Sequence, residues 1–429
     1  MTPYLAIRNL LLQRRRYALM AAAVVIGFLL VTILTAAAQG AMETIQSKGA
    51  RYFSGHVSVT GFRQNQQVIS DPLAVVEAVQ QTPVPLRTVA PRVIYYRRDA
   101  RLFFGGNSVR QRRLVGVDFE AEGREIATLD FRAGGIEPFA TDGGENGVLI
   151  SEVVAELLSA RLGDDITVLL TTDDGQINTV TLVVHGIFRE AGIFGYVTYM
   201  RMQDLNQVLG RPVDAATDVA VYLRNPASLP PAAEAIRTGL ADRFAVFPPV
   251  LHRRDFSAVV DRNVQQETLA VVSLDAQLAE IRDLVDAFLM VSNFVVVLFM
   301  VIVMFGILNT YRVLLHQRTR EIGTMRALGM SRGGIMRVFL IEAAFLAVLA
   351  SFVGFLIATV LLSIGETVSV GTGPAVAMFT ERGRLQFSIR FPTVAVNLLL
   401  MVGAVLVAAW GPAYKASRLH PVEALRKDT

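Results

Sequence analysis

Four long apolar runs constrain this chain more than any other feature of its sequence. They cover residues 17–38, 287–311, 338–364 and 392–411, and Glu342 is the charged residue within them. A helix needs about 20 apolar residues to cross the hydrocarbon of a bilayer. Hydrophobic residues make up 52% of the chain and charged residues 18%, which is more apolar side chain than one soluble core hides. We therefore expect an α-helical membrane protein with four transmembrane helices.

Basic residues flank these runs and predict their orientation. Residues 1–16, 312–337 and 412–429 are rich in arginine and lysine, and the positive-inside rule places such segments in the cytoplasm. This predicts a multi-pass protein of the bacterial inner membrane with both termini cytoplasmic. The positive net charge then reflects topology and contact with membrane lipid, and we expect no nucleic-acid partner. The residues concerned are Arg8, Arg14, Arg15, Arg16, Arg312, Arg318, Arg320, Arg326, Arg332, Arg337, Lys415, Arg418, Arg426 and Lys427.

The first apolar run has a second interpretation, because a basic start and the small residues "TAAAQ" at 35–39 are typical of a cleavable signal peptide. Its apolar core is longer than the usual ~7–15 residues of such signals, which favours a retained anchor. The chain has no cysteine, so disulfides and thiolate metal ligands are excluded. His185 has no neighbouring ligand in sequence and is expected to be structural. We expect no metal site and no directly bound cofactor.

Residues 39–263 are expected to form a large α+β extracytoplasmic domain between the first and second transmembrane helices. Two strand–helix–strand units predict a ferredoxin-like sandwich, interrupted by an insertion at about 118–214. In the insertion, Ser151 and Glu152 are expected to be a helix cap and a first-turn acid and not a catalytic pair. The predicted units are 55–61, 71–81 and 86–96, then 218–225, 230–243 and 244–250, and the predicted insertion helix is 150–163.

Residues 264–286 show apolar positions near helical spacing, among them Leu269, Val272 and Leu278. The pattern continues to Tyr311 and predicts one helix that stands outside the membrane as a stalk and then crosses it. The alternative is a helix that breaks near Asp283. Residues 365–391 are expected to be a short external loop.

The loop at 312–337 carries a predicted short amphipathic helix. Thr319 is a candidate N-cap, Ile322, Met325 and Leu328 form an apolar stripe with Glu321 at its edge, and Gly329 ends the helix. Ser331 is expected to cap the next membrane helix. The arginines of the predicted short helix could simply face lipid phosphates. Charge balance alone, however, does not need a capped helix with an apolar stripe. The pattern therefore favours a helix that binds a partner.

Two motifs resemble the FtsX-like, or MacB-type, ABC permease family. The segment "RTREIGTMRALGMSRGG" followed by a membrane helix is similar to the family pattern R-x-x-E-I-x-x-x-R-A-x-G-x-S with an early glutamate, here Glu342. The C-terminal "GPAYKASRLHPVEALRKD" is similar to the family's terminal P-A-x-x-A-x-x-x-x-P-x-E-A-L-R, and "LAIRNLLLQRRRYAL" resembles its opening. The resemblance covers both ends of the chain and all four apolar runs. Its matching positions are Arg318, Glu321, Ile322, Arg326, Ala327, Gly329, Ser331, Pro412, Ala413, Ala416, Pro421, Glu423, Ala424, Leu425 and Arg426.

This resemblance implies a permease subunit that works by mechanotransmission with an ABC ATPase dimer and a second permease subunit. The sequence has no G-x-x-x-x-G-K-[ST] loop, so ATP and Mg²⁺ are expected to be handled by the partner ATPase and the chain is not expected to be an enzyme. By the same resemblance, the ATPase-coupling residues are Arg318, Arg320, Glu321, Ile322, Met325, Arg326, Leu328, Gly329 and Ser331.

Glu342 is interpreted as a structural carboxylate, snorkelling or paired with an arginine, in preference to a proton relay, because no second intramembrane acid or histidine accompanies it. The large predicted external domain is similar to the lipoprotein-releasing (LolC- and LolE-like) branch, so lipoprotein release, with a periplasmic carrier, is the leading expectation. The alternatives are MacB-type efflux of small molecules or peptides with an adaptor protein, or a membrane-anchored sensor or enzyme.

Overall fold

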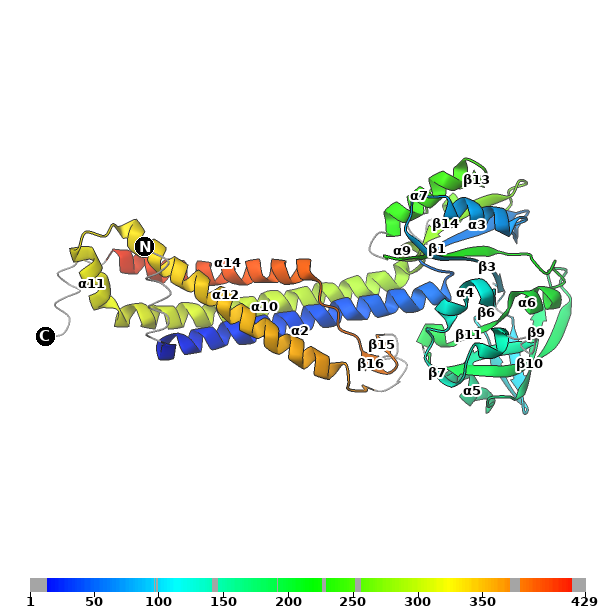
Figure 1. Cartoon of the computed structure of the whole chain (residues 1–429), viewed down its shortest axis with the longest axis horizontal. Coiled ribbons are helices and arrows are strands. Elements are labelled where there is room, and N and C mark those ends of the chain that lie inside the picture. The colour runs from blue at the N-terminus through cyan, green and yellow to red at the C-terminus, as the bar shows by residue number, and fades with distance from the viewer. Residues whose placement is uncertain are drawn as a thin grey trace. The chain divides into compact units, whose positions relative to one another are not determined.

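The structure is a computed structural model that describes residues 14–95, 97, 99–140, 146–190, 192–225, 229–250, 256–370 and 379–418. These residues fall into two compact units, whose elements are labelled in Figure 1. The helical unit comprises Met1–Ala41, Asp286–Ser369 and Leu385–Thr429. The α+β unit comprises Met42–Val285 and Val370–Arg384. The boundaries between them fall within two long helices, α2 (Arg14–Tyr52) and α10 (Ala279–Gln317), and at the two ends of segment 370–384.

Within the described residues, the helical unit contains four helices that are long and apolar enough to cross a membrane, which confirms the predicted number. Their inward sides share one core that includes Phe28, Tyr311, Phe339 and Met401. Large apolar side chains such as Leu399 are exposed, as expected of a surface that faces lipid. The helices are α2 (Arg14–Tyr52), α10 (Ala279–Gln317), α12 (Arg332–Gly365) and α14 (Phe391–Ser417), with the short α11 (Thr319–Ala327) between α10 and α12.

The α+β unit is built on a βαββαβ arrangement, as the sequence predicted, but its fourth strand is β14 (Thr268–Ser273) and not the predicted strand at 244–250. The strand order β14-β1-β12-β3 is antiparallel throughout, with Val57 paired to Val221 on one side and to Ser273 on the other. Helices α3 and α7 contact each other and pack on these strands. Asp71 caps α3 by accepting a hydrogen bond from Ala74 N. The elements are β1 (Val57–Arg63), β2 (Gln66–Gln67), α3 (Pro72–Gln80), β3 (Leu86–Tyr95), β12 (Asp218–Leu223), α7 (Leu229–Ala241), β13 (Ala245–Val246), α8 (Phe256–Val259), β14 (Thr268–Ser273) and α9 (Leu274–Gln277).

The insertion between β3 and β12 extends the same sheet, because its strand β6 pairs with β3. The order continues β6-β11-β8-β10-β9-β4-β5, around a core that includes Ile150, Leu182 and Met200. Ser151 caps α5 by accepting a hydrogen bond from Val154 N, as predicted. The insertion begins earlier than predicted, since β4 to β6 precede residue 118. Its elements are β4 (Arg101–Phe104), β5 (Asn107–Arg110), β6 (Arg113–Val117), α4 (Phe119–Ile126), β7 (Phe131–Gly134), η1 (Glu137–Ala140), β8 (Gly147–Ser151), α5 (Glu152–Leu158), β9 (Asp165–Thr171), β10 (Ile177–Phe188), η3 (Gly192–Gly195), β11 (Val197–Arg201) and α6 (Met202–Leu209).

The predicted stalk helix at 264–286 is wrong in its first part. Residues Thr268–Ser273 form strand β14, and the long helix α10 begins at Ala279. Helix α10 then continues to Gln317 without a break at Asp283, so that alternative is wrong as well. The predicted strand at 244–250 shrinks to the two residues of β13, which pair in parallel with β14. Within the predicted loop 365–391, β15 (Thr380–Glu381) pairs with β16 (Arg384–Leu385).

Helix α2 extends further than the predicted membrane segment. It continues as one helix past residue 38 to Tyr52, for 39 residues in all. Its last turn contains Arg51, and a basic residue near a helix C-terminus interacts favourably with the helix dipole. The first apolar run therefore passes without interruption into the α+β unit.

Candidate functional site

Helix α11 occupies the loop where the sequence predicted an amphipathic helix. It ends at Ala327, and Gly329 follows with φ of +88°, a left-handed conformation that favours glycine. Ser331 then caps α12 by accepting a hydrogen bond from Gly334 N, as predicted. The predicted N-cap is wrong, because Thr319 lies inside the helix and donates its hydroxyl hydrogen bond to His316 O. The N-cap position belongs to Arg318, whose side chain makes no capping hydrogen bond.

The two faces of α11 differ in burial. Ile322 and Gly323 are buried, and Met325 packs against the core of the helical unit. The opposite side, which we call the outer face, is exposed. It consists of Arg320, Glu321, Thr324, Ala327 and Leu328.

The predicted apolar stripe is therefore divided between the two faces. Ile322 and Met325 contact the chain's own bundle, so they are not available to a partner. Leu328 is 84% exposed and is the apolar residue of the stripe that stays at the surface. The sequence correctly predicted an amphipathic helix but not which apolar residues remain at the surface. Of the other predicted residues, Arg320, Glu321, Gly329 and Ser331 are exposed and Arg326 is half-buried.

Arg318 anchors α11 from inside the bundle. Its side chain is 2% exposed, and Nη1 donates hydrogen bonds to Glu342 Oε2 at 2.8 Å and to Tyr17 Oη at 2.9 Å. Its Nε donates to Glu321 Oε2 at 2.7 Å, and Tyr17 Oη donates to Glu342 Oε2 at 2.9 Å. The guanidinium of Arg318 therefore lies within the chain's own fold and not on the outer face.

This set of Tyr17, Arg318, Glu321 and Glu342, the anchor cluster, links three elements. Tyr17 belongs to α2, Glu342 to α12, and the other two residues to the start of α11. The predicted arginine partner of Glu342 is confirmed. A buried ion pair with additional hydrogen bonds fixes geometry because each charge is costly to leave alone. The anchor cluster therefore holds the start of α11 in place while the outer face stays exposed.

The C-terminal motif is described in part. Pro412 lies inside α14, and Ala413 and Ala416 are buried on the same helix. Pro421, Glu423, Ala424, Leu425 and Arg426 lie outside the described residues, as does Arg8.

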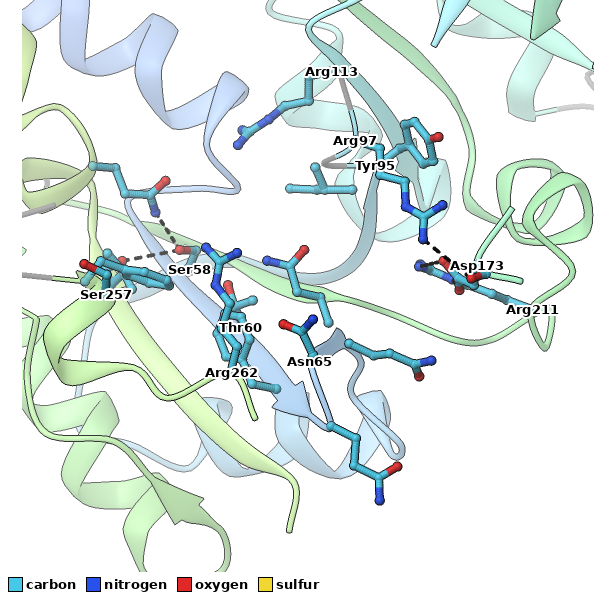
Figure 2. Close-up of a pocket in the computed structure, with 18 of the residues that line it drawn as sticks. Ser58, Thr60, Asn65, Tyr95, Arg97, Arg113, Asp173, Arg211, Ser257 and Arg262 are labelled. Carbon is cyan, nitrogen blue, oxygen red and sulfur yellow. Dashed lines mark hydrogen bonds and ion pairs between the residues drawn. The ribbon is translucent and has the colours of Figure 1, made fainter. Parts of the chain in front are cut away.

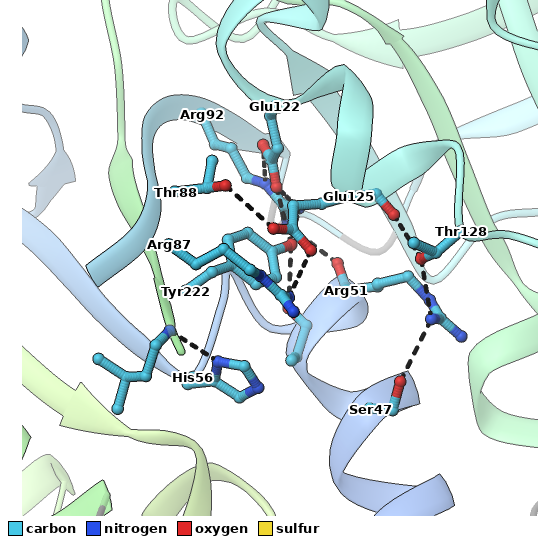
Figure 3. A network of polar contacts seen from close by, with 12 residues as sticks. Ser47, Arg51, His56, Arg87, Thr88, Arg92, Glu122, Glu125, Thr128 and Tyr222 are labelled. Atoms are coloured by element: carbon cyan, nitrogen blue, oxygen red, sulfur yellow. Dashed lines mark hydrogen bonds and ion pairs between the residues drawn. The ribbon is translucent and has the colours of Figure 1, made fainter. Parts of the chain in front are cut away.

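A second buried network surrounds the end of α2 in the α+β unit (Figure 3). Arg92 of β3 and Glu122 of α4 form a fully buried ion pair, and Arg92 Nη1 donates to Arg51 O at 2.9 Å. Tyr222 Oη donates to Glu122 Oε1 at 2.8 Å, and burial raises the pKa of Tyr222 well above its usual range. Arg113 Nη1 donates to Tyr52 O. Guanidinium groups thus satisfy carbonyls at a helix C-terminus that have no partner within the helix.

Sequence reasoning missed this second network. An arginine inside the otherwise apolar strand "TVAPRVIYY" was the available signal, because a buried arginine requires an acidic partner. That partner, Glu122, lies 30 residues away on a helix of the insertion. Among the described residues, no group of three or more His, Cys, Asp or Glu side chains could hold a metal ion. His185 packs edge-to-face on Phe139, with ring centroids 5.4 Å apart.

Four membrane-length helices, an α+β domain inserted after the first, and a short helix between the second and third are the architecture of a multi-pass membrane protein. Residues 17–238 match the MacB-like periplasmic core domain, and residues 293–421 match the FtsX-like permease C-terminal domain. The first match covers more than half of the chain. The chain therefore belongs to the MacB-like family of ABC transporter permeases, with an FtsX-like C-terminal part.

Individual relatives match a smaller part of the chain. A macrolide export ATP-binding/permease protein MacB from Rhodopirellula baltica is 40% identical over 119 residues, which is 28% of this chain and 15% of that protein. The ABC transporter permease YtrF of Bacillus subtilis is 28% identical over 127 residues, 28% of each chain. The matched segment thus spans less than a third of these relatives. The crystal structure of the periplasmic region of MacB from Actinobacillus actinomycetemcomitans aligns with a TM-score of 0.32 at 12% identity, covering 54% of this chain and 95% of that one.

Proposed function

We propose that this chain is the transmembrane subunit that passes the motion of a separate ABC ATPase to its own α+β unit. The observation that carries this proposal is the arrangement of α11. Its start is held by the buried anchor cluster, and its outer face presents a highly exposed leucine beside charged groups. Such a surface suits a protein partner, because an apolar contact surrounded by polar groups is the common composition of an interface.

The membrane orientation is part of the same proposal. The segment that contains α11 is rich in arginine, so it lies on the cytoplasmic side of the inner membrane, where an ATPase has access to ATP. The α+β unit then lies outside. Helices α2 and α10 both run from the helical unit into the α+β unit. Movement of α11 is therefore transmitted to the outside through continuous helices, without passage of the substrate through the bundle.

The names of the relatives favour export as the transport function of this chain. Several of them are named macrolide export ATP-binding/permease proteins, and each matches 28% of this chain. We propose that the chain moves a small molecule or peptide away from the outer side of the membrane, together with a second permease subunit and an adaptor. ATP and Mg²⁺ bind the partner ATPase. Lipoprotein release stays a prediction.

Leu328→Asp tests the coupling role. The variant places a charge at the centre of the proposed interface but leaves the anchor cluster intact, whereas Glu321→Lys would also disturb Arg318. Affinity purification of the tagged full chain from its native membranes measures the ABC ATPase that is retained and the ATP hydrolysis of the complex. We expect both to fall at least tenfold, because a buried unpaired charge costs several kcal/mol.

Val213→Asp is the matched control, since Val213 is a 58% exposed valine of the α+β unit. It should retain the ATPase like the natural protein. If Leu328→Asp retains the ATPase and its activity at the level of this control, α11 is not the coupling element. If the natural protein retains no ATPase at all, the proposed function is wrong.

A further inference from the structure

A cavity of about 880 Å³ opens in the α+β unit (Figure 2). Its wall combines residues of β1 and the turn that follows it, the ends of β3 and β6, and the segment from Phe256 to Gln277. The insertion contributes Asp173 and Arg211. The volume is within the range of about 300–1,000 Å³ that is typical of small-molecule sites.

The charges around the cavity are predominantly positive. Among the described residues, four arginines and one acid line it, namely Arg97, Arg113, Arg211, Arg262 and Asp173. The acid is already neutralised, because Arg211 binds Asp173 through two hydrogen bonds of 2.6 Å and 2.9 Å (Figure 2). Arg97 and Arg262 add guanidinium charges that Asp173 does not neutralise. A cationic ligand would be repelled by this wall.

The arginines are held in place mainly by neutral groups. Arg97 Nη1 donates to the carbonyl of Thr172 at 2.9 Å, and Arg262 lies over the ring of Phe256 at 5.8 Å. Arg113 lies over the ring of Tyr52 at 4.6 Å. A carbonyl or an aromatic ring orients a guanidinium without cancelling its charge. Arg97 and Arg262 are therefore positioned and still able to bind an anion.

The rest of the wall offers hydrogen bonds. Gln64, Asn65, Gln66, Gln67 and Gln277 contribute amide groups, which both donate and accept. Apolar side chains, among them Phe62, Phe256 and Val272, form another large part of the wall. The composition therefore suits a ligand that carries an acidic group on a body with both polar and apolar parts.

We propose that this cavity binds a small molecule bearing a carboxylate or phosphate group, with Arg97 and Arg262 binding the oxyanion and the glutamine-rich wall binding its polar body. Both acidic groups match the planar fork of donors on a guanidinium. The site stands independently of the coupling role of α11, because it lies within the α+β unit.

Calorimetric titration of the full chain in phosphatidylcholine nanodiscs tests this site. The probes are citrate for carboxylates, glucose 6-phosphate for phosphates, and glucose as the neutral control. We expect saturable binding of at least one acidic probe and none of glucose. The Arg97→Gln/Arg262→Gln double variant should bind that probe at least tenfold more weakly. Comparison of the two acidic probes identifies which group the site prefers.

Arg237→Gln is the matched control, because Arg237 lies on α7 outside the cavity and pairs with Glu234. It should bind the acidic probe like the natural protein. Unchanged melting temperatures of both variants show that the arginine changes leave the fold intact. The proposal is overturned if neither acidic probe binds saturably, if the double variant binds as tightly as the control, or if glucose binds equally well.

Discussion

At the scale of single residues, the anchor cluster shows how a membrane bundle can hold a charged pair. Arg318 and Glu342 have side chains that are 2% and 0% exposed. Each charge would be costly alone in a low-dielectric interior, and each is compensated by the other and by the hydroxyl of Tyr17. Arg318 also lies over the ring of Phe339 at 5.3 Å. The pair is thus a constraint on geometry more than a source of stability.

Glu342→Gln should therefore be strongly destabilising. It leaves the buried guanidinium of Arg318 without its main counter-charge, which typically costs ~3–5 kcal/mol. Thermal unfolding of the purified chain in detergent should show a clearly lower melting temperature. The Arg318→Leu/Glu342→Leu double variant should recover most of this loss, because neither charge remains. A Glu342→Gln variant that melts like the natural protein would contradict the role assigned to the pair.

His56 predicts a local dependence on pH. It is 5% exposed, its Nδ1 accepts a hydrogen bond from Leu223 N at 3.0 Å, and burial together with Arg87 lowers its pKa to about 4. Below the unfolded pKa of 6.5 the unfolded state takes up a proton that the folded state excludes. The stabilising effect of neutral His56 is therefore complete above pH 6.5 and decreases as the pH falls towards 4, by up to ~3 kcal/mol.

Hydrogen exchange at peptides that contain Leu223 measures this effect, after correction for the intrinsic pH dependence of exchange. Protection should fall between pH 6.5 and pH 4.5 in the natural protein. His56→Asn keeps an acceptor near the position of Nδ1 but does not titrate, so its protection should change less over the same range. Parallel profiles for the two proteins would show that His56 does not control this part of the sheet.

At the scale of elements, the sequence predicted the features that depend only on residues close together in the chain. The caps Ser151 and Ser331 occupy the predicted positions, because a side-chain oxygen at the N-cap bonds backbone N–H groups two or three residues on. The four membrane helices were predictable for a similar reason, since length and hydropathy suffice. Their ends were not, because a helix continues into a water-exposed region without any change in its own hydrogen bonding.

The error at Thr268–Ser273 has a physical reason. Leu269 and Val272 lie three residues apart, as on a helix, but the residues between them are apolar too. A short apolar run fits a strand that is buried on both faces as well as a buried helix. Strand β14 pairs with β1 on one side and β13 on the other, and its four middle residues are buried. Pairing with strands that are distant in sequence makes this segment a strand. A local sequence pattern holds no information about such partners.

The candidate site was likewise predictable only where residues close together in the chain determine it. Sequence periodicity predicted the amphipathic helix α11 and its C-terminal glycine. It could not predict that Arg318 turns inward, because its partners Glu342 and Tyr17 lie 24 and 301 residues away. Nor could it predict the cavity, whose arginines come from separate strands and loops of the α+β unit.

At the scale of the whole molecule, the proposed function depends on which sides of the membrane the two units occupy. The chain has no cysteine, so a single introduced cysteine reports its own position without background. Leu328 on the outer face of α11 and Ile177 in β10 are suitable positions, with side chains 84% and 73% exposed. The arginine distribution predicts that Leu328 is cytoplasmic and Ile177 is outside.

A membrane-impermeant maleimide applied to spheroplasts should therefore label Ile177→Cys and leave Leu328→Cys unlabelled until the membrane is permeabilised. Ile322→Cys is the matched control for burial, because Ile322 lies on the same helix and is 0% exposed. Ile322→Cys should stay unlabelled even after permeabilisation. This result would distinguish a position that is buried from an exposed position that the reagent cannot reach across the membrane. Labelling of Leu328→Cys in intact spheroplasts would place α11 outside, away from ATP. No cytoplasmic ATPase could then bind that helix, and α2 and α10 would have no motion to transmit.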